Sequence, residues 1–182
     1  MRKGRIAVFS MVAALAVLTM SAAPALAQNA TTSAKDEMLF WIADAQEKLA
    51  ALAEATPADK YGWRPAEGVR STGEVFMHVA AANYGLPTFW GVAAPEGFEF
   101  QSYEKSITAK ADIQKALAES FAHMKKSLEA ADDAALQKQI ELFGMKSSVR
   151  GAYMLLLSHA HEHLGQSIAY ARSNGIVPPW SK

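Results

Sequence analysis

Apolar residues recur every three or four positions in four long segments of this chain, the spacing of one face of an α-helix. The first segment spans residues 34–55 and is rich in Ala, Leu, Glu and Lys, which also favour a helix. Its apolar positions are Met38, Leu39, Ile42, Ala45 and Leu49. Another helix is predicted from Thr108 to about Ala131, with an apolar stripe of Ile113, Leu117, Phe121, Met124 and Leu128.

Capping and stop signals delimit two further helices. Ser71 and Glu74 have capping-box spacing, so a helix is expected to begin at Ser71 and to end or kink at Gly85 and Pro87. The last helix is expected to begin after Ser147 or Ser148 and to end at residues 174–175, Asn-Gly.

The connections between these helices contain proline and glycine, and residues 56–70 and 86–107 are predicted as loops. The second loop is aromatic, and its rings would line a substrate pocket, cap the core or contact a second copy of the chain. Residues 140–147 fit either a small hairpin or an irregular loop. Four long helices without convincing strand alternation predict an all-α four-helix bundle, occupying residues 28–182 as one domain.

Residues 1–27 have the pattern of a cleaved signal peptide. A basic start is followed by the apolar run 6–20 and by the small-residue cleavage site Ala25-Leu26-Ala27, so we expect a periplasmic or secreted protein. A membrane anchor is the alternative, but the run is short and no basic stop follows it. No later segment is long enough to span a bilayer, so stable membrane insertion is not expected after cleavage.

Composition excludes several classes of function. Of the 182 residues, 18 are basic and 18 acidic, and loss of Arg2, Lys3 and Arg5 with the signal leaves a formal charge of −3. A weakly acidic protein has no electrostatic footprint for nucleic acid. The chain has no cysteine, so it forms no disulfide and supplies no thiol of its own as nucleophile or metal ligand.

Three of the five histidines lie close together in the sequence LSHAHEHLGQ, within the last predicted helix. His159 and His163 are about 40° apart around a helix axis, whereas His161 points about 160° away from each. The pair shares the predicted inward face with Leu155, Leu156, Gln166 and Tyr170. Buried imidazoles need partners, and a shared metal is one solution.

His78 is the candidate third ligand, because it lies on the predicted core face of the second helix with Val75, Ala82 and Leu86. Three neutral imidazoles suit Zn, Ni or Fe(II) and leave positions open for water or substrate. His123 stands beside two lysines and is interpreted as a surface or groove histidine. The alternative is a structural bundle without metal, in which the histidines hydrogen-bond one another.

Two segments resemble the DinB/YfiT-like family. They are STGEVFMHVAAANY, from Ser71, and LSHAHEHLGQSIAYARSNGIVPP, from Leu157; GWRPAEGVRS, from Gly62, resembles the family's lead into its second helix. The resemblance implies a four-helix bundle, often dimeric, that holds a divalent metal through His78, His159 and His163. Many relatives carry a further histidine where this chain has Glu162. Gln166 fits the family's Gly-Gln pair, either bonding a ligand or bound water or satisfying backbone.

The resemblance also implies metal-dependent chemistry on a small-molecule substrate, since known members transfer low-molecular-weight thiols or isomerise their adducts. A bound metal would lower the pKa of a thiol or water. A thiol would have to come from the substrate, and export to an oxidising compartment makes hydrolysis a competing possibility. A non-catalytic metal-binding or interaction module is the other alternative. Loose acid–base candidates are Glu74, Glu162, Tyr61 and Tyr170.

Overall fold

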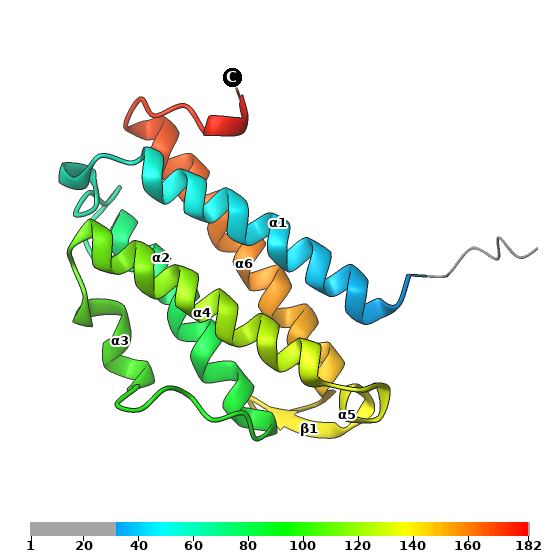
Figure 1. Cartoon of the computed structure of the whole chain (residues 1–182). Helices are drawn as coiled ribbons and strands as arrows, with labels where there is room; N and C mark the ends of the chain where they lie inside the picture. Colours follow the sequence, from blue (N-terminus) through cyan, green and yellow to red (C-terminus); the bar gives the residue numbers. More distant parts are fainter. Residues whose placement is uncertain (1–31, 182) are drawn as a thin grey trace, which may run out of the picture. The chain divides into compact units, whose positions relative to one another are not determined.

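A computed structural model describes residues 32–181, and within them four long helices pack side by side (Figure 1). They are α1 (Ala34–Ala55), α2 (Thr72–Gly85), α4 (Lys110–Ala130) and α6 (Val149–Ser173). All four predicted helices are therefore confirmed, with bounds close to those expected. The predicted signal peptide, residues 1–27, lies outside the described residues.

The helices form a ring in which α4 and α6 each contact both α1 and α2. The Lys110 ammonium, at the start of α4, donates to the carbonyls of Glu54 and Thr56 at the end of α1, so these helices are antiparallel. At the start of α2, the hydroxyl of Tyr170, near the end of α6, reaches the Arg70 carbonyl, so α6 is antiparallel to α2.

Two consecutive long helices, α2 and α4, run in the same direction. Gly73 lies against Ile113 and Asn83 bonds Ser120, so positions along both helices increase together. A parallel pair requires a long crossover, which here contains η2 (Leu86–Trp90) and α3 (Phe100–Ser106). The predicted long connection over residues 86–107 is therefore present, but it contains two short helices, and α3 has consequences for the site.

Shorter elements complete the described part. Residues 56–70 include the 3-10 turn η1 (Ala58–Lys60), α5 (Asp133–Gln137) follows α4, and η3 (Pro179–Ser181) follows α6. Between α5 and α6, β1 (Gln139–Leu142) pairs antiparallel with β2 (Met145–Ser148). Of the two possibilities for residues 140–147, the structure has the hairpin.

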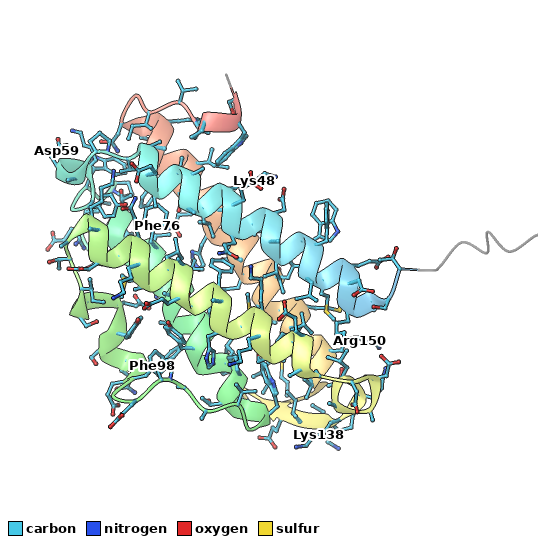
Figure 2. The ribbon with its side chains drawn as sticks, in the orientation of Figure 1. Lys48, Asp59, Phe76, Phe98, Lys138 and Arg150 are labelled. Atoms are coloured by element: carbon cyan, nitrogen blue, oxygen red, sulfur yellow. The ribbon has the colours of Figure 1, made fainter. Side chains whose placement is uncertain are left out.

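The core lies between the four long helices. Phe76, labelled in Figure 2, and the predicted stripe of α4 are buried there. Leu155 corrects the sequence interpretation: it was expected on the inward face of the last helix but is 39% exposed, because Leu156, one position on, takes the core position. None of the helices in the described range has the length and apolar content needed to cross a membrane.

The capping box at the start of α2 is confirmed and yields a stability prediction. The Ser71 hydroxyl accepts from the Glu74 amide at 3.3 Å, and the Glu74 carboxylate accepts from the Ser71 amide at 2.7 Å. We expect Ser71→Ala to lower the free energy of unfolding by about 1 kcal/mol, because one helix-terminal donor loses its partner. Urea denaturation would measure this, with the exposed Ser173→Ala as control. Equal stability of the two variants would contradict it.

Candidate metal centre

Three histidines meet midway between α2 and α6. His159 Nε2 lies 3.0 Å from His78 Nε2 and 3.1 Å from His163 Nε2. One ring nitrogen of each lies within 4.8 Å of the others, so this group could hold a metal ion. His78 and His159 are partly buried and His163 is buried. The predicted proximity of these three side chains is confirmed.

Hydrogen bonds behind His163 determine which of its nitrogens carries the proton. The Arg70 carbonyl only accepts, so the Tyr170 hydroxyl donates to it at 3.2 Å and accepts from Gln166 Nε2 at 3.0 Å. Gln166 Oε1 therefore faces His163 Nδ1, 2.8 Å away, and accepts its proton. A neutral His163 thus presents the lone pair of Nε2 to the other histidines. Of the two roles expected for Gln166, the structure has the bond to the histidine.

The ion pair of Glu104 and Arg70 likewise determines which nitrogen of His78 carries the proton. The Glu104 carboxylate of α3 accepts from Arg70 Nε at 2.7 Å and Nη2 at 3.0 Å, and from His78 Nδ1. With the proton on Nδ1, neutral His78 also presents its Nε2 lone pair. Arg70 thereby supports the hydrogen-bond partners of both histidines. Its guanidinium binds Glu104, the partner of His78, and its carbonyl binds Tyr170, which in turn holds Gln166, the partner of His163.

His159 Nε2 faces the lone pairs of both His78 Nε2 and His163 Nε2, but His159 cannot donate a hydrogen bond to both. A single Nε2 proton on His159 can serve only one neighbour, and His159 Nδ1 is buried without a partner among the described residues. One divalent cation would accept lone pairs from all three Nε2 atoms, with the His159 proton on Nδ1. The donor set therefore fits a metal better than it fits a self-contained hydrogen-bond network.

The electrostatic environment keeps His159 and His163 neutral. Burial, together with the neighbouring His163, His78 and Arg70, lowers the pKa of His159 to about 3. Burial also lowers the pKa of His163, partly offset by its bond to Gln166. Burial opposes ionisation of Glu104, but the hydrogen bonds from Arg70 and His78 outweigh it and hold the carboxyl pKa below its usual value. Neutral imidazoles are the form that binds metals.

These shifts predict how the metal-free protein responds to acid. Unfolded His159 takes up a proton near pH 6.5, whereas the folded form resists protonation until about pH 3. Its contribution to stability is therefore complete above pH 6.5 and is lost as the pH falls from 6.5 towards 3. Urea denaturation in chelator should show this decline, and His159→Gln should flatten it. An unchanged slope in His159→Gln, equal to that of the exposed control His161→Gln, would refute the assignment.

Other predicted candidates lie outside this cluster. His161 is exposed and bonds the Leu157 carbonyl of its own helix, as expected from its angle. His123 packs edge-on against Tyr84 at 5.2 Å between ring centroids, which agrees with a groove position. Glu162 is exposed on α6. The Tyr61 hydroxyl donates to the Ala53 carbonyl at 2.8 Å, and burial raises the pKa of this phenol.

A cavity of about 490 Å³ adjoins the residues that support the histidine cluster. Its walls include Glu104 and Gln166, the outer partners of His78 and His163, together with three basic residues, Arg64, Arg70 and Lys105. Glu74 also lines it, but its carboxylate is bound to the Ser71 amide and lies 3.3 Å from Arg64. A molecule in this cavity would contact Glu104 and Gln166, the residues that hold two of the histidines, in a predominantly basic environment.

Sequence interpretation missed Glu104 and Arg70. Glu104 is one of three acidic residues in a segment broken by proline and glycine, and the seven-residue α3 has no side-chain cap that would identify it as a helix. Arg70 directly precedes the Ser71 cap, where a basic residue has no expected role. No spacing rule connects Glu104 with His78, because the crossover brings them together.

A helical bundle with three histidines converging between two helices defines a class of candidate metal-binding proteins. Residues 42–167 match the DinB superfamily, so this chain belongs to that superfamily. A comparison with curated proteins gave no match.

Solved structures show the same fold. A DinB-like protein from Bacillus cereus has a TM-score of 0.68 at 19% identity, covering 78% of this chain and 93% of that one. YjoA, a DinB-like protein from Bacillus subtilis, has a TM-score of 0.63 at 21% identity, covering 80% and 97%. YfiT from Bacillus subtilis, described as a probable metal-dependent hydrolase with an unusual four-helix bundle topology, has a TM-score of 0.64 at 14% identity, covering 79% and 89%. At these identities the likeness concerns the fold alone.

Proposed function

We propose that this protein is an exported metal-dependent hydrolase acting on a small-molecule substrate. It holds one divalent metal through the Nε2 atoms of His78, His159 and His163. The observation that carries the proposal is the convergence of these atoms, with the Nδ1 protons of His78 and His163 held from behind by Glu104 and Gln166.

Three neutral imidazoles suit Zn, Ni and Fe(II) alike, so direct analysis must decide the metal. When bound, such a cation supplies Lewis acidity at the site and lowers the pKa of a coordinated group. Residues of the protein fix the orientation of the rings. The Arg70 guanidinium orients Glu104, and the hydrogen bonds from the Arg70 carbonyl to Tyr170 and from Tyr170 to Gln166 orient Gln166. Rigid outer partners of this kind maintain ligand direction and basicity.

The adjoining cavity supports a polar substrate with a carbonyl or anionic oxygen. Arg64, Arg70 and Lys105 line it, and the guanidinium group is suited to binding carboxylate or phosphate oxygens. The carboxylates of Glu104 and Glu74 are already hydrogen-bonded. In this proposal Glu104 positions His78, and Glu74 caps the start of α2.

Hydrolysis is favoured over thiol transfer by two observations. YfiT, which shares the fold, is described as a probable metal-dependent hydrolase. This chain contains no cysteine, so a transferase reaction would require a thiol from the substrate, and the proposed export places the protein where free thiols are scarce.

The test uses residues 28–182 purified without a histidine tag, stripped with chelator and reloaded separately with Zn, Ni and Fe(II). We expect about one metal per chain and hydrolysis of one class among p-nitrophenyl esters, p-nitroanilides and p-nitrophenyl phosphates, only in the reloaded protein. Turnover only with a small thiol and an electrophile would indicate a transferase. Full metal occupancy without any turnover would indicate a non-catalytic metal-binding module.

A further inference from the structure

A second cavity, of about 410 Å³, lies where the C-terminal end of α2 meets η2, the following loop and the hairpin turn. None of its lining residues carries a charge, and none belongs to the three-histidine cluster or its supporting residues. The lining consists of Gly85, Leu86, Thr88, Phe89, Ala94, Phe98, Phe100 and Phe143. Half of these residues are phenylalanines, contributed by η2, the loop that contains Phe98 (Figure 2), α3 and the hairpin.

Three of the phenylalanines around this hollow are unusually exposed. Phe143 is 62% exposed and Phe89 and Phe100 are each 45% exposed, whereas Phe76 and Phe121 are completely buried in the core. The rings of Phe143 and Phe89 lie edge to face with centroids 5.3 Å apart. Leaving large apolar rings in water forgoes the stabilisation that burial would provide, so packing of the bundle does not account for them.

Phe143 also occupies an unfavourable backbone position. It is the non-glycine residue with positive φ, +53°, within the described range, and Gly144 follows with φ +77°. Two positive φ angles between paired strands are the pattern of a type I′ turn, in which Asn, Asp or Gly is favoured at the first position. Neither the turn geometry nor burial therefore explains why a phenylalanine occupies this position. The position of its ring does explain it, because the ring forms part of the cavity wall.

A glycine builds the opposite wall. A Cβ added to Gly85 would lie 2.3 Å from Phe100 Cδ2, so the Phe100 ring lies directly on the backbone of α2. Gly85 is the last residue of α2, and its lack of a side chain permits a ring to approach that no other residue would allow. Phe143, at an unfavourable backbone position, and Gly85, which permits close approach of a ring, thus line the same hollow.

We propose that this cavity binds a small uncharged molecule with an aromatic or alicyclic framework, independently of the three-histidine site. The size fits: a buried cavity of about 150 Å³ accommodates benzene, and small-molecule sites have volumes of about 300–1,000 Å³. The uncharged lining fits as well, because an unpaired charge is costly to remove from water. A second protein surface would cover the exposed rings of Phe89 and Phe143 but leave the hollow that they line unfilled.

Fluorescence titration with N-phenyl-1-naphthylamine, an uncharged probe made of a naphthyl and a phenyl group, tests this site. We expect saturable binding of about one probe per chain, unchanged by chelator. Phe143→Asn should weaken binding at least tenfold without lowering the thermal midpoint, since Asn suits the turn. Phe89→Ser, an exposed position, should weaken it as well, and Gly85→Ala should do so by displacing Phe100. The control Phe40→Ala alters an exposed ring on α1 and should bind like wild type.

Several results would overturn the proposal. Non-saturable binding by the wild type, or equal affinity in Phe143→Asn and Phe89→Ser, would show that the cavity takes no such ligand. A lower thermal midpoint in Phe143→Asn with unchanged affinity in Phe89→Ser would assign the rings a structural role. A dimer that dissociates in Phe143→Asn, measured by light scattering, would instead make this face a contact between copies of the chain.

Discussion

Replacing His159 by alanine is expected to abolish stoichiometric metal binding. His159 stands between the other two candidate ligands, 3.0 Å from His78 Nε2 and 3.1 Å from His163 Nε2. Without it, two imidazoles remain, which is too few for a firm transition-metal site. Elemental analysis of the untagged wild type should give about one Zn, Ni or Fe per chain, and His159→Ala should give a content at background.

His161→Ala is the matched control for this experiment. It removes a histidine from the same helix, two positions away, but its ring is exposed and bonds only the backbone carbonyl of Leu157. It should retain wild-type metal content. Equal metal loss in both variants would point to adventitious binding, and no metal in the wild type after incubation with all three metals would leave a bundle with structural histidines.

Replacing Glu104 by glutamine should weaken metal affinity about 10- to 100-fold, the usual effect of losing a hydrogen-bond partner behind a ligand. Glutamine keeps the size of the side chain but loses the negative charge that His78 Nδ1 and the Arg70 guanidinium share. His78 is then held less firmly in the direction that a metal requires. Competition with a chromophoric chelator would measure the affinity in wild type and variant.

Glu99→Gln controls for the loss of one negative charge near α3. Glu99 is the exposed residue at the N-cap of the same helix, and its side chain makes no capping bond. Its metal affinity should equal that of the wild type. If Glu104→Gln also matched the wild type, Glu104 would serve only to attach α3 through its ion pair with Arg70.

Much of the fold followed from local patterns. The bounds of α1 agree with the segment predicted from its apolar spacing, and the Ser71–Glu74 capping box fixed the start of α2. These features involve residues three or four positions apart, where helix geometry alone determines the contact. Leu155 shows where such patterns stop: adjacent leucines at 155 and 156 both fit the stripe, and only packing against the other helices selects Leu156.

The supporting residues of the site could not be predicted in the same way. Glu104 meets His78 across 26 positions because α2 and α4 are parallel, and the crossover that this requires passes over His78. The hairpin was undecided from the sequence because Phe143 occupies a turn position that usually takes Asn, Asp or Gly. In both places a contact between residues far apart in the sequence, His78 with Glu104 and Phe143 with Phe89, is decisive, and local sequence patterns do not report such contacts.

The sequence by itself determined the four helices and the shared face of His159 and His163, because these depend on the helical repeat and on capping within a few residues. Only the tertiary structure decided that His78, 81 positions before His159, lies 3.0 Å from it, and that Arg70 supports the hydrogen-bond partners of both outer histidines. Distances between helices depend on their packing and relative direction, and these are properties of the whole bundle.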